Sequence, residues 1–128
     1  MSTSDTIVFF HAPNTRSSGA RILLEELAAP HELRVVNMKA GEQRKPAFLA
    51  VNPMGKVPAI LHRGALVTEQ AAIFIYLADL FPKAGLAPAT DDRLRGPYLA
   101  GATLMLAVAL PTLAASRIRG RPAICRRR

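Results

Sequence analysis

Cysteine is almost absent from this chain of 128 residues, which has a single example, Cys125, near its end. One thiol excludes a framework of internal disulfides and a Cys-x-x-Cys redox motif. Histidine is scarce as well, and the three examples lack the spacing and the cysteine or acidic partners of a metal site: His11, His31 and His62. We therefore expect no metal.

An N-terminal targeting segment is also missing from the pattern. Residues 1–6 are polar, and the apolar run 7–10 is too short for the core of a signal peptide. Together with the scarcity of cysteine, this predicts a cytoplasmic protein.

Acidic residues are absent beyond Asp92. Residues 1–92 hold all nine acids and nine of the 17 basic residues, so their net charge is zero. Residues 93–128 hold eight arginines and carry the whole net charge of +8. This split predicts a balanced globular part and a basic tail. Because no aromatic side chain alternates with the arginines to stack on bases, no nucleic-acid partner is expected.

Residues 98–116 form a run of 19 uncharged residues followed by arginines, which has the length and the positive flank of a membrane span. Six of the 19 are alanine, and glycine, threonine and proline interrupt the run. Membrane insertion is therefore the less favoured interpretation.

The hydrophobic pattern predicts one α/β domain with the order β-α-β-α-β-β-α. Pro30 and Pro82 stop the two long helices, a right-handed crossover joins the first two strands, and the turn at 62–64 makes a hairpin. These connections give a mixed four-strand sheet. The expected elements are strands 6–10, 32–36, 59–61 and 66–68, and helices 18–29, 47–51 and 69–81.

The two long helices differ in their apolar surfaces. Helix 69–81 is apolar nearly all round and needs cover on more than one side. Thr68 is expected to be its N-cap, so that Glu69 and Gln70 lie at a positive helix end that attracts anions. The expected core side of helix 18–29 consists of Ala20, Ile22, Leu23 and Leu27.

A proline stands at the mouth of the third strand. Asn52-Pro53 and Met54-Gly55 are turn signals, and Val57-Pro58 then leads into the apolar run Ala59-Ile60-Leu61. Pro58 has no N–H to give to a sheet. The backbone of Val57 is therefore expected to face away from the ladder, where it can pair with something outside the sheet.

Two motifs in this region together resemble the glutathione-binding half of the cytosolic glutathione transferases. They are Asn52-Pro53-x-Gly55-Lys56-Val57-Pro58-Ala59-Ile60 and, after the hairpin, Thr68-Glu69-Gln70-x-Ala72-Ile73-x-x-Tyr76-Leu77. The resemblance extends over residues 7–99. It implies a thioredoxin-like fold, glutathione and a small electrophile as substrates and, in the family, a homodimer.

The resemblance also assigns residues to glutathione. Pro58 would be cis, and the Val57 backbone would pair with the cysteinyl part. Glu69 and Gln70 would hold the γ-glutamyl end; many members have Ser or Thr in place of Gln70, whose amide still offers a donor and an acceptor. The glycyl carboxylate would contact two further polar residues, Gln43 and Lys56. For Lys56, a solvated loop lysine is the alternative.

The glutathione thiol needs a hydrogen-bond donor, because a free thiol has a pKa of about 8.5. The family supplies Tyr, Ser or Cys in the loop after the first strand, whereas this loop has neither Tyr nor Cys. Asn14 falls at the usual serine position. The candidates are ranked Thr15, then Ser17, then Asn14. Capping of the following helix is the alternative for each hydroxyl, and for Ser18 it is preferred.

The resemblance predicts residues 1–83 as the glutathione-binding domain and residues 84–99 as a linker and the start of a helical second domain. Residues 100–128 lack acids and aromatics and form an apolar, then arginine-rich, tail that is expected to be a short helix or disordered. A shifted reading frame or a truncation would produce this change, as would a short natural variant.

Three functions remain open at this point. The chain is a transferase that conjugates glutathione to an electrophile, a non-catalytic module that only binds glutathione, or a basic fragment that associates with membranes or polyanions. The family's second domain builds the electrophile pocket. Its absence predicts weak or absent conjugation and argues against a homodimer.

Overall fold

The computed structural model describes residues 5–104 and divides the chain into two units, with the division between Ala87 and Pro88. The predicted tail beyond residue 104, with Cys125 and most of the terminal arginines, lies outside the described residues.

The first unit is built on a sheet of four strands in the order β2-β1-β3-β4. β1 (Ile7–His11) runs parallel to β2 (His31–Val35) and antiparallel to β3 (Ala59–His62). β4 (Ala65–Thr68) pairs with β3 in the antiparallel sense. The predicted mixed sheet and thioredoxin-like topology are confirmed.

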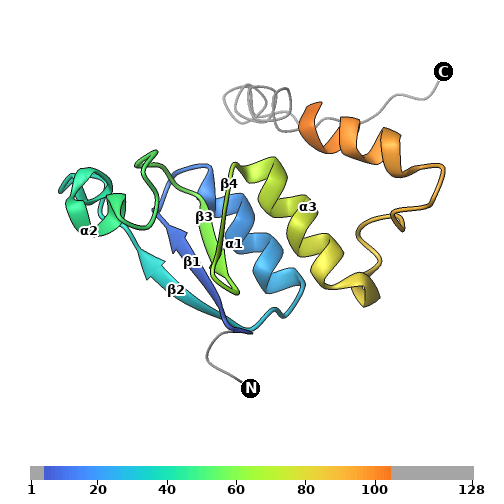
Figure 1. The fold of residues 1–128 in the computed structure, drawn as a ribbon, viewed down its shortest axis with the longest axis horizontal. Coiled ribbons are helices and arrows are strands. Elements are labelled where there is room, and N and C mark those ends of the chain that lie inside the picture. The colour runs from blue at the N-terminus through green and yellow to red at the C-terminus, as the bar shows by residue number, and fades with distance from the viewer. Residues whose placement is uncertain (1–4, 105–128) are drawn as a thin grey trace, which may run out of the picture. The chain divides into compact units, whose positions relative to one another are not determined.

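The two long helices of this unit pack against each other on one face of the sheet (Figure 1). α1 (Ser17–Glu26) connects β1 to β2, and α3 (Gln70–Leu80) follows β4. The short α2 (Pro46–Leu49) begins at its proline, as expected for a residue without an N–H to pair. A short 3-10 helix, η3 (Pro82–Ala84), comes after α3.

Alternation along β1 divides its side chains between the two faces of the sheet. Ile7 and Phe9 lie in the core formed with α1 and α3. Phe10 faces the other way and meets Phe48 of α2 edge to face, with ring centroids 5.6 Å apart. The backbone of β1 is thus enclosed on both sides, which fixes the position of the loop that follows it.

A two-residue turn, Arg63-Gly64, joins β3 to β4, because His62 pairs with Ala65. Both turn residues have positive φ values, 52° and 78°, as in the type I′ turns that suit twisted antiparallel strands. At the other end of this hairpin, Ala59 pairs with Thr68. β4 therefore ends, and α3 begins, at the edge of the sheet where β3 starts.

The buried side of α1 overlaps the predicted one but does not include Ile22. Leu24 and Ala20 are fully buried, at the four-residue spacing of one helix face. Ile22 is 63% exposed, so the prediction that it faces the core is wrong. Leu23 and Leu27 flank the buried side and are partly buried.

The start of α3 also differs from the prediction. Thr68 is the last residue of β4 and not the N-cap, and Glu69 is the N-cap and not the first helical residue. Glu69 has φ 68° and ψ 126°, and its carbonyl accepts the first helical hydrogen bond, from the Ile73 N–H at 2.9 Å. The chain turns directly from strand to helix at this residue, which leaves no room for a separate cap.

The predicted loop around Gly41 contains a 3-10 helix that the pattern did not indicate, η2 (Glu42–Arg44). Gly41, with φ 69°, precedes it. The Glu42 carboxylate accepts the Asn37 N–H at 2.7 Å, which closes the loop. This closure places Gln43 against the turn before β3.

In the second unit, residues 95–104 are helical, and residue 104 is the last that the structure describes. Within residues 5–104, no helix has both the length and the apolar character needed to cross a bilayer.

Candidate functional site

Five elements of the first unit begin or end at one edge of the sheet. β1 ends there and leads into α1, and β3, which is antiparallel to β1, starts there. β4 ends at the same edge and leads into α3. The N-termini of α1 and α3 therefore lie at this edge, beside the mouth of β3 (Figure 1). Both helix ends present partial positive charge there.

The turn that enters β3 has the predicted form. The Val57-Pro58 peptide bond is cis, as expected. Sheet pairing of β3 begins at Ala59, so Val57 lies outside the ladder, half-buried, while Pro58 is buried. The Val57 backbone is thus positioned to pair with a chain that is not part of the sheet.

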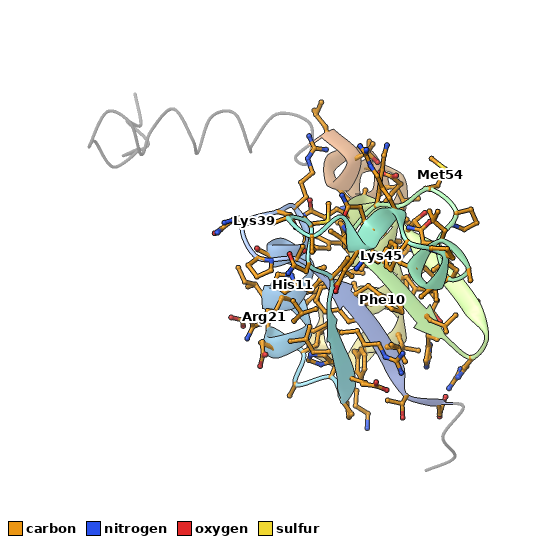
Figure 2. All side chains as sticks on the ribbon, turned by 90° about the vertical axis from the view of Figure 1, so that its left-hand side faces the viewer. Phe10, His11, Arg21, Lys39, Lys45 and Met54 are labelled. Atoms are coloured by element: carbon orange, nitrogen blue, oxygen red, sulfur yellow. The ribbon has the colours of Figure 1, made fainter. Side chains whose placement is uncertain are left out.

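Asn52 holds this turn together. The Asn52-Pro53 pair predicted a turn here but gave no sign of the role of the Asn52 side chain. Its side chain is buried, with 1% exposure. Its Nδ2 donates to the Lys56 carbonyl at 2.8 Å, and its Oδ1 accepts the Met54 N–H at 3.1 Å. Its carbonyl also accepts the Gly55 N–H at 2.9 Å. In Figure 2 the Met54 side chain extends outward, consistent with its 65% exposure.

Gly55 brings η2 against the turn. It has φ 60°, and a Cβ at this position would lie 2.9 Å from the Gln43 carbonyl oxygen, closer than a Cβ normally packs. Gln43 therefore lies close to Gly55, the residue before Lys56. Its Oε1 is buried and has no hydrogen-bond partner among the described residues. Lys56 is exposed, and no acidic side chain in the described part of the chain pairs with it.

The first residues of α3 face α1. Gln70 folds its side chain onto Gly19, where an added Cβ would lie 2.4 Å from Nε2. Glu69 is exposed, and within residues 5–104 no basic side chain forms an ion pair with it. Its left-handed φ of 68° costs about 1 kcal/mol or more for a non-glycine residue. Such conformations are concentrated at functional sites.

The loop between β1 and α1 contains the three ranked candidates for thiol activation, and the structure places them differently. Ser17 is fully buried, and its Oγ accepts the Ala12 N–H at 3.0 Å. Thr15 is half-buried, and its Oγ1 accepts the Ser17 N–H at 3.2 Å. Asn14 is exposed with φ 59°.

Neither Ser17 nor Ser18 caps α1. The N-cap of α1 is Arg16, which has no side-chain cap bond, and Ser17 Oγ bonds to groups in the preceding loop. The predicted capping role of Ser17 or Ser18 is therefore wrong. The hydroxyl of Thr15 satisfies a first-turn amide instead.

His11 is part of this site, although the sequence offered no sign of it beyond a histidine at the end of an apolar strand. It is 3% exposed, stacks on Phe9 with centroids 5.7 Å apart, and its Nδ1 lies 2.7 Å from Ser17 Oγ. Burial lowers the pKa of His11, and the positive charge of Arg21 lowers it further. His11 is therefore a neutral imidazole at pH 7. Figure 2 labels His11 and Arg21.

The edge thus combines four kinds of chemistry. It presents an unpaired carboxylate at a helix N-terminus, backbone at a strand mouth, a lysine beside a buried amide, and a hydroxyl at the start of a second helix. This combination suits an extended peptide with an ammonium at one end and a carboxylate at the other. Within residues 5–104, no three His, Cys, Asp or Glu side chains gather to hold a metal ion.

Comparison with known proteins agrees with this geometry. Residues 4–79 match the family model described as glutathione S-transferase, N-terminal domain. A maleylacetoacetate isomerase of Pseudomonas aeruginosa is 37% identical over 85 residues, which cover 64% of this chain and 39% of that protein. "Glutathione S-transferase 1" of Dianthus caryophyllus is 35% identical over 68 residues, or 53% of this chain and 31% of that protein.

Two of the solved structures that are similar to this fold contain glutathione. A glutathione transferase homologue from Sulfitobacter with bound glutathione has a TM-score of 0.71 and 32% identity, covering 95% of this chain and 58% of that one. A sphingomonad glutathione S-transferase complexed with glutathione has a TM-score of 0.68 and 38% identity, covering 77% and 50%. The matched part of the chain thus spans about a third of the length of these curated relatives. By its fold and its match over residues 4–79, the chain belongs to the glutathione S-transferase family, whose N-terminal domain it contains.

Proposed function

We propose that the first unit binds glutathione along this edge. Glu69 takes the γ-glutamyl ammonium, while Gln70 and the first amides of α3 take its carboxylate. The Val57 backbone pairs with the cysteinyl residue, and Lys56 holds the glycyl carboxylate. The observation that carries the proposal is the exposed, unpaired Glu69 in a left-handed conformation at the start of α3, at the same edge as the free backbone of Val57.

Gln43 supports the glycyl end of this arrangement. Buried polar atoms without partners are rare in folded proteins, and Gln43 Oε1 is one among the described residues. A carboxylate has no proton to donate, so Gln43 would meet it through Nε2. Its Oε1 would accept a ligand N–H, which the glycyl amide supplies.

Thr15 is proposed as the group that stabilises the thiolate. It is the half-buried hydroxyl of the loop, whereas Ser17 is fully buried and Asn14 is exposed to solvent. One hydrogen bond to the charged sulfur is worth about 1.5–3 kcal/mol, or about one to two units of thiol pKa. Such a shift brings a substantial part of the thiol into the reactive form near neutral pH.

Calorimetry with glutathione tests the binding proposal. Glu69→Gln keeps the size of the side chain but removes its charge, so we expect affinity to fall about 10- to 150-fold. Glu26→Gln makes the same change at an exposed residue at the other end of α1 and is expected to bind like the unaltered protein. Equal affinities for all three proteins would show that Glu69 does not hold the ligand.

Conjugation to an electrophile is proposed to be weak or absent in this chain alone. The matched family model describes an N-terminal domain and covers residues 4–79, whereas the resemblance assigns the pocket for the second substrate to the family's second domain. An assay with chlorodinitrobenzene, in which the thiolate displaces chloride, tests this directly. Robust turnover would overturn the proposal. We also propose a cytoplasmic location, on the basis of the family. The family resemblance implies a homodimer, and sedimentation of the purified chain would decide between a monomer and a homodimer.

A further inference from the structure

The hydroxyls of Thr15 and Ser17 form a chain of short contacts that ends at a buried imidazole. Ser17 Oγ lies 2.7 Å from Thr15 Oγ1 and 2.7 Å from His11 Nδ1. Thr15 donates to the Ala12 carbonyl at 2.7 Å, and Ser17 Oγ lies 3.0 Å from the same oxygen. Thr15 is half-buried, while His11 and Ser17 are enclosed, so the chain runs from the edge of the site inward.

The number of protons limits how this chain can be arranged. Each hydroxyl has one proton and accepts two hydrogen bonds. One acceptor position on Ser17 Oγ is filled by the Ala12 N–H, and one on Thr15 Oγ1 is filled by the Ser17 N–H. Each oxygen therefore has one acceptor position left. The direction of the remaining bonds depends on whether His11 has its proton on Nδ1.

If Nδ1 has the proton, it donates to Ser17 and fills the last acceptor position there. The 2.7 Å contact between the two hydroxyls then requires Ser17 to donate to Thr15. Both acceptor positions of Thr15 are now filled, so its own proton must point away from the chain. It goes to the Ala12 carbonyl in the free protein and is available to a ligand atom at the edge.

If Nδ1 lacks the proton, Ser17 donates to it, and the contact between the hydroxyls requires Thr15 to donate to Ser17. The Thr15 proton is then directed inward. We propose that His11 is a positioning residue whose Nδ1–H tautomer directs the Thr15 hydroxyl proton out of the chain and toward the thiol of the bound ligand. This inference rests on the proposed function, because it assumes that Thr15 faces the glutathione sulfur.

Two observations support this arrangement. His11 is neutral at pH 7 because burial lowers its pKa, so its single proton occupies one nitrogen or the other. In the Nδ1–H arrangement Thr15 donates to the Ala12 carbonyl at 2.7 Å, whereas in the other arrangement both hydroxyl protons are used within the chain and neither reaches that carbonyl. When the Thr15 proton changes direction, its hydrogen bond to the Ala12 carbonyl is exchanged for one to the ligand.

Two variants of the full chain separate the hydrogen bond from the packing of the ring. In His11→Asn the side-chain Nδ2 takes the place of the ring Nδ1 and can only donate, whereas His11→Leu has no donor. The readout is the thiol pKa of bound glutathione, measured from the ultraviolet absorbance of the thiolate. His11→Leu is expected to raise it by roughly 0.3–0.5 unit, and His11→Asn to leave it unchanged.

The same thiol pKa in His11→Leu as in the unaltered protein, or an equal rise in both variants, would overturn the inference. A second measurement does not require glutathione: the ¹⁵N shifts of the His11 ring in the unaltered protein show which nitrogen has the proton. Protonated Nδ1 is expected, and a bare Nδ1 would refute the inference. Failure of the proposed function looks different, because glutathione would then not bind, or Thr15→Val would leave the thiol pKa unchanged.

Discussion

Replacing Gly19 by alanine is expected to weaken glutathione binding without damaging the fold. Gly19 is in the first turn of α1, and an added Cβ would lie 2.4 Å from Gln70 Nε2 and 3.3 Å from Phe74 Cζ. The first distance is too short for any contact, so something must move. The atom in the way is the far end of a flexible side chain, and Gln70 can leave without moving the backbone.

The two consequences have different magnitudes. Alanine is favoured over glycine inside a helix by about 1 kcal/mol, which offsets the lost packing of Gln70, so the free energy of unfolding should change by less than about 1 kcal/mol. Displacing Gln70 removes a hydrogen bond from its amide to the ligand's carboxylate, and such a bond to a charged group is worth about 1.5–3 kcal/mol. Affinity should therefore fall about 10- to 150-fold.

Calorimetry and urea unfolding of three variants provide the test. Gly19→Ala and Gln70→Ala should weaken binding by similar factors, and the double variant should be no weaker than either, because both changes remove the same contact. If Gln70→Ala weakens binding while Gly19→Ala does not, the conformation of Gln70 against Gly19 is not the one that binds. A large loss of stability in Gly19→Ala would contradict the reasoning about the flexible side chain.

Three further predictions concern the frame of the site. Gly55→Ala should destabilise the protein by about 2–3 kcal/mol, because Gly55 has a φ of 60° and an added Cβ would also meet backbone. Gly64→Ala should cost only about 1 kcal/mol, because Gly64 has a φ of 78° but open space around it. Equal losses of stability for the two variants in urea unfolding would argue against the backbone contact of Gly55. Leu24→Ala should lower the free energy of unfolding by about 2–5 kcal/mol, because Leu24 is fully buried, and Ile22→Ala by less than about 0.5 kcal/mol, because Ile22 is exposed. If Ile22→Ala instead lowered the thermal unfolding temperature more than Leu24→Ala, the ranking would be disproved. The pKa of His11 is lower in the folded protein than in the unfolded chain, so as the pH falls the unfolded chain takes up the proton first. The stability that neutral His11 contributes is therefore complete above pH ~6.5. Below that pH the free energy of unfolding falls by up to about 1.4 kcal/mol per pH unit. Urea unfolding of His11→Asn should show a shallower slope in that window, and an unchanged slope would remove His11 as the cause.

The order of elements could be predicted because it depends on short-range patterns. Apolar runs, prolines after the helices and the Arg63-Gly64 turn each act within a few residues. The cis Val57-Pro58 bond followed from a motif and not from periodicity. The structure therefore confirms both the topology and the mouth of β3.

Other features depend on contacts between distant segments, which one sequence does not show. The side of α1 that faces the sheet is set by α3 and β1, so Leu24 and not Ile22 is buried. Glu69 is a cap in a left-handed conformation because β4 and α3 are joined directly, a constraint that helix propensity does not include. The role of His11 requires Ser17 to fold back onto it across the loop.

The central claim is that glutathione lies along the edge where β3, α1 and α3 begin. The most direct test is a ¹⁵N–¹H spectrum of the chain during a glutathione titration. We predict saturable shifts concentrated at the amides of Thr15, Val57 and Gln70, with those of the opposite edge, such as Arg63, unmoved. Shifts confined to other surfaces, or none at millimolar glutathione, would contradict the account.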